Sequence, residues 1–246
     1  MKIGGETIIE IKDLQKSFAG TAVLSGINLI VKKGENLVIL GKSGEGKSVT
    51  LKCITGLIVP DAGSVKVFDK EIADQDEDEL KTLRGRMGYL FQGSALYDSM
   101  TVKENLSFPL KRVLRIKDTE EIEKRCAQVL EEVGLTDTID KMPSDLSGGM
   151  RKRMALARTL IVRPEIILYD EPTTGLDPIT SKEISQLILK MQKQYQSTSV
   201  IVTHDIPCAK IIADRVVIMH DGTYIAEGSF EELEKSEDEF IRSFFN

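Results

Sequence analysis

The sequence predicts an α/β fold with a mainly parallel β-sheet and one helical insertion. Short, mainly apolar runs at 36–40, 166–169 and 199–203 are typical of strands buried on both faces. Segments with the helical spacing of apolar residues lie between such runs, as in sheets of parallel strands. Residues 94–162 break this alternation and look mainly helical, so we interpret them as an insertion in the α/β core.

The first third of the chain reads as strands and turns. Residues 7–11, 27–31 and 63–69 alternate between apolar and polar, which predicts strands with one solvated face. The glycine-rich residues 41–48 follow the first buried strand directly, and the spacing at 48–57 predicts a helix next.

The clearest predicted helix lies in the insertion, over residues 118–134. Asp118 is a suitable N-cap, and Gly134 is suited to end the helix. Near the end of the chain, residues 215–228 predict a β-hairpin with an Asp-Gly turn. The helix has one apolar face, formed by Ile122, Cys126, Val129, Leu130 and Val133.

Composition limits the class of protein. The 246 residues are 41% hydrophobic and 29% charged, which is typical of a soluble globular protein. We find no signal-peptide core and no apolar run near the roughly 18 residues of a membrane span. Three scattered cysteines indicate reduced thiols in a cytosolic protein. The net charge of −6 argues against general nucleic-acid binding, so we expect no nucleic-acid partner.

The segment "GKSGEGKS" at 41–48 fits the pattern G-x-x-x-x-G-K-[ST] of a phosphate-binding loop. Lys47 would reach the β- and γ-phosphates of a nucleotide, and the Ser48 hydroxyl would bind Mg²⁺. The alternative is a glycine loop with an incidental lysine, but the required strand precedes the loop and a helix follows it. The predicted nucleotide contacts are Gly41, Lys42, Ser43, Gly44, Glu45, Gly46, Lys47, Ser48 and Val49.

Asp170 and Glu171 end another buried strand. Ligands of open parallel sheets bind at the carboxyl ends of the strands. Asp170 would hold Mg²⁺, through water, and Glu171 would orient or deprotonate an attacking water. The alternative is an acidic turn stopped by Pro172; the nearby phosphate loop favours the functional interpretation.

Three further residues are candidates with structural alternatives, and His220 is interpreted only as structural. His204 follows a buried strand and would hydrogen-bond the γ-phosphate or the water, whereas a strand-end histidine is commonly structural. His220, in the hairpin, is interpreted as a surface turn residue. Gln92 is a candidate catalytic residue, metal contact and sensor, or an ordinary loop residue. Phe18 would stack on adenine, or is a half-buried strand aromatic.

A second phosphate-binding sequence, "LSGGM", occupies 146–150. Its serine and adjacent glycines precede a run with helical periodicity, and free N–H groups at a helix start attract anions. The chain therefore contains two phosphate-binding sequences about a hundred residues apart.

Together these motifs resemble the ATP-binding cassette ATPases. "GKSGEGKS", "LFQ", "LSGG", "ILYDEP", "GLD" and "VTHD" occur in the order of that family and span nearly the whole chain. The resemblance implies one domain over 1–246, with a P-loop α/β core and antiparallel β subdomain (1–93 and 163–246) and a helical subdomain (94–162). It also implies ATP and Mg²⁺ as ligands.

The resemblance answers why two phosphate-binding sequences occur. In this family "LSGG" is the signature motif. Cassettes of the family pair head to tail, and the signature motif of each copy covers the ATP held by the other copy. Ser147, Gly148 and Gly149 would thus bind the γ-phosphate in trans, and Asp177 resembles the residue that crosses the dimer interface. Met150 stands where the family usually has glutamine, so any contact made by that amide is absent here.

Among cassettes, "LSGGM" with "RKRMALAR", "GLDPIT" and "FPL" is most similar to the Mla type and to organic-solvent-tolerance systems. This resemblance implies an ATPase that drives phospholipid transport in the bacterial envelope. It would lie in the cytoplasm, on the inner face of the cell membrane, with integral-membrane permease subunits and a lipid-binding substrate protein as partners.

If a permease is the partner, we expect its docking groove to be lined by residues just after Gln92, in a segment that leaves the sheet. Apolar side chains in this segment would suit a helix-in-groove contact. The apolar residues of this segment are Leu96, Tyr97, Met100 and Phe108, and the alternative is that they pack inside the insertion's own core. Leu96 and Tyr97 are the better candidates for the groove, and Phe108 is the better candidate for the core. Three alternatives stay open: a transporter with another substrate, a cassette of DNA repair or translation, and a regulatory cassette with degenerate catalysis.

Overall fold

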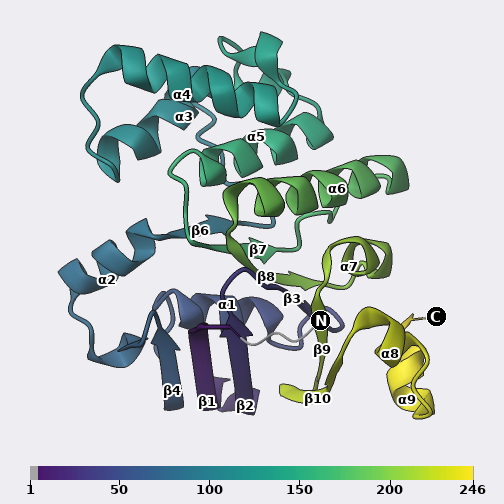
Figure 1. Ribbon diagram of the computed structural model, residues 1–246. Coiled ribbons are helices and arrows are strands. Elements are labelled where there is room, and N and C mark those ends of the chain that lie inside the picture. Colours follow the sequence, from purple (N-terminus) through teal and green to yellow (C-terminus); the bar gives the residue numbers. More distant parts are fainter. Residues whose placement is uncertain (1–4, 246) are drawn as a thin grey trace.

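The computed structural model describes residues 5–245 and contains a six-stranded, mostly parallel sheet (Figure 1). Only its edge strand, β10, runs antiparallel to its neighbour. The carboxyl ends of the parallel strands therefore meet at one edge, which confirms the predicted α/β class. In spatial order the strands are β10 (Thr223–Gly228), β9 (Arg215–His220), β3 (Asn36–Leu40), β8 (Thr198–Thr203), β7 (Ile166–Asp170) and β6 (Met87–Leu90).

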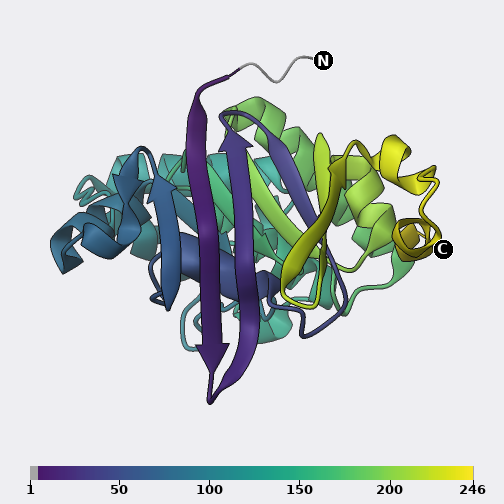
Figure 2. The same cartoon turned by 90° about the horizontal axis from the view of Figure 1, so that it is seen from below.

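A second sheet of four strands is antiparallel, as the family resemblance implied. Its two long strands cross the face seen in Figure 2. The tight turn between them lies at Ala19 and Gly20, both with positive φ, as this kind of hairpin turn requires. In spatial order the strands are β2 (Thr21–Lys32), β1 (Thr7–Phe18), β4 (Ala62–Val67) and β5 (Lys70–Glu71).

Helix α1 (Lys47–Ile54) lies between the two sheets (Figure 1). Leu51 and Ile54 of this helix pack in one apolar core with Leu37 and Ile39 of β3 and with the inner face of the antiparallel sheet. The alternate residues of β3, Val38 and Leu40, belong to a second core on the other face. Burial on both faces explains why β3 is apolar from Leu37 to Leu40.

The second core is covered by helices of the middle and late chain. In Figure 1, α3, α4 and α5 form the layer farthest from the antiparallel sheet, and α6 lies between them and the parallel sheet. The subdomain boundaries at 93/94 and 162/163 stay a prediction. The helices are α3 (Val102–Arg112), α4 (Thr119–Glu132), α5 (Gly148–Leu160), α6 (Pro178–Tyr195) and α7 (Ile206–Ile212).

The helix predicted over 118–134 is α4. Asp118 caps it by accepting the Glu120 N–H at 3.0 Å, and Gly134 follows it with φ +70°. The five predicted apolar residues are all buried. The remaining helices are α2 (Glu77–Gly85), α8 (Phe230–Glu234) and α9 (Glu239–Arg242), and 3₁₀ turns lie at Ile72–Asp74, Thr136–Thr138, Pro143–Asp145 and Ser243–Phe245.

The three cysteines are free and buried. Burial raises the pKa of the Cys53 thiol to about 11, so this thiol stays protonated at neutral pH. Across residues 5–245 we find no helix with both the length and the apolar character needed to cross a membrane.

Candidate functional site

The phosphate loop joins β3 to α1. Lys47 is only 5% exposed, and its ammonium donates to the carbonyls of Gly41 and Lys42, each at 2.8 Å. These bonds hold the cation inside the loop. Gly46 has φ +102°, and a Cβ there would lie 2.7 Å from the Val23 carbonyl oxygen. The last glycine of the motif is therefore required by both its backbone conformation and its neighbours.

Asp170 lies at the carboxyl end of β7 and meets the loop. The Ser48 hydroxyl donates to Asp170 Oδ1 at 2.6 Å, and the Tyr89 hydroxyl donates to Oδ2 at 3.0 Å. Burial and the nearby carboxylate raise the pKa of Tyr89 far above its usual value, so the phenol remains a donor. Two residues 122 positions apart are thus in direct contact at the predicted magnesium position.

The donor set at this position fits Mg²⁺. Mg²⁺ prefers oxygen ligands and keeps several waters, so one hydroxyl and one carboxylate suffice when phosphates supply the rest. Ser48 and Asp170 present that pair. Within residues 5–245, no cluster of three or more His, Cys, Asp or Glu side chains is arranged to hold a metal alone.

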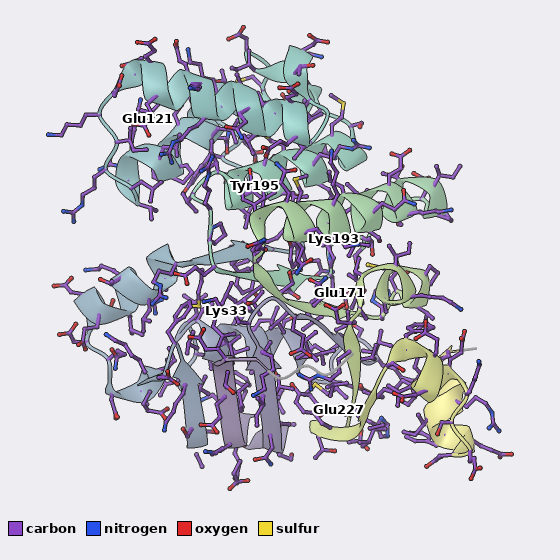
Figure 3. All side chains as sticks on the ribbon, viewed as in Figure 1. Lys33, Glu121, Glu171, Lys193, Tyr195 and Glu227 are labelled. Atoms are coloured by element: carbon purple, nitrogen blue, oxygen red, sulfur yellow. The ribbon has the colours of Figure 1, made fainter. Side chains whose placement is uncertain are left out.

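Glu171 follows β7 in a strained conformation with φ +50° and is 7% exposed. Figure 3 shows it in the middle of the molecule, near the level of the parallel sheet. Its Oε2 lies 2.9 Å from His204 Nδ1 and accepts from the hydroxyls of Thr174 (3.1 Å) and Thr203 (3.3 Å). Its Oε1 lies 3.5 Å from Lys47 Nζ. The carboxylate is thus held beside the phosphate loop by several partners.

These residues enclose a hollow of about 200 Å³. It joins predicted residues from four parts of the chain: the phosphate loop, Gln92, Glu171 and His204. Phe18, predicted to stack on adenine, lies outside the lining, and its exposed ring stands at the end of β1. The lining consists of Val23, Ser43, Gly44, Gly46, Lys47, Ser48, Val49, Gln92, Glu171 and His204.

The second phosphate-binding sequence begins α5. Ser147 is the N-cap, and its hydroxyl accepts the Met150 N–H at 3.3 Å. A Cβ at Gly149 would lie 2.7 Å from Thr180 Cγ2, so close packing against α6 requires this glycine. Asp177 caps α6, and its hydrogen bonds from Thr180 lower the pKa of its carboxyl.

The start of α5 opens onto a hollow of about 830 Å³. The predicted residues Ser147, Gly148, Gly149 and Asp177 all line it. Within the described residues 5–245, its lining shares no residue with that of the smaller hollow. The predicted residues that line a hollow therefore fall into two separate groups.

Two contacts of this region were not found from the sequence. Lys152 of α5 is buried and donates to the Gln92 carbonyl at 2.5 Å, and desolvation lowers its pKa. Arg158 of the same helix donates to the Ser94 carbonyl at 3.4 Å. The helical spacing of Lys152 with buried Ala155, Leu156 and Thr159 was the available signal of a buried lysine.

His220 differs from its prediction as a surface turn residue. It is half-buried, and its Nδ1 lies 3.1 Å from Oε1 of Glu45 in the phosphate loop. Strand β9 pairs in parallel with β3, so the ends of both strands lie side by side. The sequence does not reveal this pairing, because β3 and β9 lie far apart in the chain.

A phosphate loop and an acidic strand end, together with a separate glycine-rich helix start, define an ATPase of the ATP-binding cassette class. The profile of the ABC transporter family matches residues 24–174. The chain therefore belongs to the ABC transporter family, and its predicted ATPase class is confirmed.

Known relatives carry names of different transporters. The chain is 40% identical to the methionine import ATP-binding protein MetN of Clostridium tetani, over 92% of this chain and 70% of that protein. It is 39% identical to MetN of Brucella abortus (90% and 59%) and to the probable ribonucleotide transport ATP-binding protein mkl of Mycobacterium leprae (97% and 68%). The chain thus spans 59% to 70% of the length of these relatives.

Solved structures share the fold. A dimer of the ATP-binding cassette MJ0796 in a post-hydrolysis state, bound to ADP and Pi, superposes with a TM-score of 0.82 at 34% identity, covering 91% of this chain and 99% of that one. The cbiO1 subunit of Clostridium perfringens, part of the transporter complex cbiONQ, gives 0.86 at 34% identity, covering 97% and 94%.

Proposed function

We propose that the chain hydrolyses ATP between its phosphate loop and the carboxylates at the end of β7, and that this drives a separate membrane permease. The observation that carries the proposal is the 2.6 Å contact between Ser48 and Asp170, with Glu171 beside it. These are the oxygen groups that would hold Mg²⁺, with Asp170 acting through water, and the base that phosphoryl transfer to water requires.

Each residue has one role in this scheme. The loop amides and Lys47 bind the phosphates, and Ser48, Asp170 and Gln92 hold Mg²⁺, which neutralises charge on the phosphates when bound. Glu171 orients the attacking water and accepts its proton, and His204 steadies the Glu171 carboxylate from 2.9 Å. Buried surroundings and four partners keep that carboxylate in place before the reaction.

A direct test compares the loss of the Asp170 carboxylate with the loss of the Tyr89 hydroxyl that donates to it. Asp170→Asn should raise the Mg²⁺ concentration for half-maximal hydrolysis on the order of 10–100-fold, as loss of an outer-shell metal partner does. Tyr89→Phe removes only the Tyr89 hydroxyl, so it should change this Mg²⁺ concentration less than about fivefold. Equal effects of the two variants would show that Asp170 acts structurally.

The signature residues 147–149 would act on a second copy of the chain. Two observations support this: their hollow is separate from the phosphate loop of their own chain, and the related cassette MJ0796 was solved as a dimer. In a head-to-tail pair, the N-terminus of α5 would face the partner's γ-phosphate with its free N–H groups and positive dipole end. Asp177 would lie at the same interface.

The proposed cargo is phospholipid, carried in the bacterial envelope with a lipid-binding substrate protein. Support comes from the Mla-type residues "LSGGM", "RKRMALAR", "GLDPIT" and "FPL". Methionine import is the second candidate, because relatives at 39–40% identity carry that name. In either case the chain would lie in the cytoplasm, held at the inner face of the membrane by its permease.

Reconstitution with its own permease separates the two cargoes. Labelled phospholipid should move between membranes in an ATP-dependent way, and external methionine should leave hydrolysis unchanged. Methionine-stimulated hydrolysis without lipid movement would assign the chain to amino-acid import.

The permease contact is proposed at Tyr97. This side chain is 43% exposed, while Leu96, the other preferred candidate, is half-buried against the helical core. Asn105 holds the Tyr97 backbone through bonds of 2.9 and 3.1 Å, and the ring packs on Phe108 with centroids 5.1 Å apart. An exposed aromatic on a fixed backbone suits an anchor for a partner helix.

Tyr97→Glu should leave hydrolysis by the isolated subunit largely intact and weaken assembly with the permease at least roughly tenfold, because the contact would bury an unpaired charge. Co-purification from membranes measures this. Ile225→Glu, an exposed apolar residue of β10, is the matched control. Normal assembly of the Tyr97 variant would place the coupling surface elsewhere.

A further inference from the structure

Glu45 is a carboxylate within the phosphate loop, and its side chain turns away from the nucleotide hollow. Its Oε2 accepts the Lys42 N–H at 3.1 Å, and its Oε1 lies 3.1 Å from His220 Nδ1. Among the residues the structure describes, it is not part of the lining of the 200 Å³ hollow, whereas Gly44 and Gly46 on either side are. The loop therefore has a defined pocket for its own negative charge.

That pocket is closely fitted. A Cβ at Gly41 would lie 2.6 Å from Glu45 Oε2 and 2.7 Å from the Met219 carbonyl oxygen. Gly41 thus leaves the space that the carboxylate occupies. The Glu45 side chain is only 11% exposed, which is low for a glutamate in a surface loop.

His220 is itself held by the end of the chain. Its ring contacts the rings of Phe240 (centroids 4.9 Å apart) and Phe244 (6.2 Å), and its Nε2 lies 3.4 Å from Asp221 Oδ2. Figure 2 shows this C-terminal segment beside the β9–β10 hairpin. The phosphate loop, the end of β9 and the C-terminal segment therefore meet at His220.

We propose that His220 is a positioning residue for nucleotide binding: it holds the Glu45 carboxylate away from the phosphates, and Phe240 and Phe244 fix its ring. The proposal rests on the proposed function, in which residues 41–49 bind ATP. The physical reason is charge, because a carboxylate free to turn toward the triphosphate would repel it.

The test is ATP affinity, measured by titration of the full chain. His220→Ala should weaken ATP binding about fivefold, the effect of one like charge at close range. Glu45→Gln sets the reference affinity of a loop that carries no charge to misdirect. The decisive variant is the double change His220→Ala with Glu45→Gln, which should bind ATP as tightly as Glu45→Gln alone.

A purely structural histidine predicts otherwise. If the double variant binds ATP as weakly as His220→Ala, or if His220→Ala binds normally, the inference is overturned. Phe240→Ala supplies a second variant with the hairpin intact, and its expected weakening should likewise vanish with Glu45→Gln. Lys210→Ala, which breaks the exposed ion pair with Glu234 nearby, is the matched control and should change nothing.

One further variant separates this inference from the proposed function. Lys47→Ala should nearly abolish ATP binding. If Lys47→Ala binds ATP normally, the phosphate-loop assignment itself is wrong; if it fails to bind while His220→Ala binds normally, only the role of His220 is lost.

Discussion

The two phosphate-binding sequences of this chain differ in what surrounds them. The loop at 41–48 lies between two sheets, contains the buried Lys47, and meets the carboxylates of Asp170 and Glu171. The sequence at 147–149 is the exposed or half-buried start of a helix, on a hollow of about 830 Å³. The first has the groups for catalysis in its own chain, and the second is suited to a phosphate presented from outside.

One helix connects the two regions. Helix α5 begins with the signature, and its buried Lys152 donates to the carbonyl of Gln92, which lines the loop hollow. A shift of Gln92 on nucleotide binding would therefore act on the helix that faces the partner's nucleotide in the proposed dimer. The two regions thus differ in the chemical groups they hold, and the bond from Lys152 to Gln92 connects them.

The largest expected effect comes from Glu171→Gln. The amide cannot accept a proton, so hydrolysis should fall by on the order of 10²–10⁴-fold while ATP and Mg²⁺ still bind. ATP should then hold two copies together, and sizing chromatography with ATP should show a stable dimer. Persistent hydrolysis with only monomer present would contradict the role of Glu171. It would also contradict the proposal that residues 147–149 bind a phosphate held by a second copy.

A mixing experiment sharpens the comparison directly. A Ser147→Arg chain and a Lys47→Ala chain are each inactive, since both of their sites are damaged. In a mixed head-to-tail dimer, one site has both lesions and the other has none. Random pairing should recover about a quarter of the normal rate if the sites act independently.

Trapped nucleotide is the second readout of this mixture, because coupling between sites affects turnover more than binding. If the mixture regains hydrolysis, trapped nucleotide or both, residues 147–149 act on the nucleotide of the partner chain. Failure to regain either one would mean that the two phosphate-binding sequences do not work on partner chains.

The smallest expected effect is that of Met150→Gln. Met150 is half-buried against the helical core, and its backbone N–H already bonds to Ser147. Restoring the usual family residue should change the rate of hydrolysis by about twofold or less, as substitutions away from critical contacts do. A large gain would show that the start of α5 relies on a side-chain amide that this chain lacks.

Much of the fold was predictable because its signals are local. The run at 36–40 and the helix at 118–134 are decided by periodicity, caps and burial within a few turns of chain. The motifs at 41–48 and 170–171 were predictable for the same reason, since each is contiguous. Their contact at Ser48 and Asp170 followed from the rule that strand ends share one edge of the sheet.

The misses have the opposite character. His220 was interpreted as a turn residue because nothing near it in the sequence indicates Glu45, 175 positions away. Lys152 was overlooked because a lysine in a helix is usually solvated. Phe18 lies outside the hollow's lining, and its stacking on adenine stays a prediction.

The sequence by itself determined the family, the order of the elements and the chemical groups for ATP hydrolysis. Those properties depend on residue type and short-range spacing, which the chain displays directly. Only the tertiary structure decided the strand order, the pairing of β9 with β3, the bond from Lys152 to Gln92 and the fit of Glu45 beneath His220. The reason is that these contacts join segments of high sequence separation, whose partners are selected by packing over the whole core and leave no periodic signal in either segment alone.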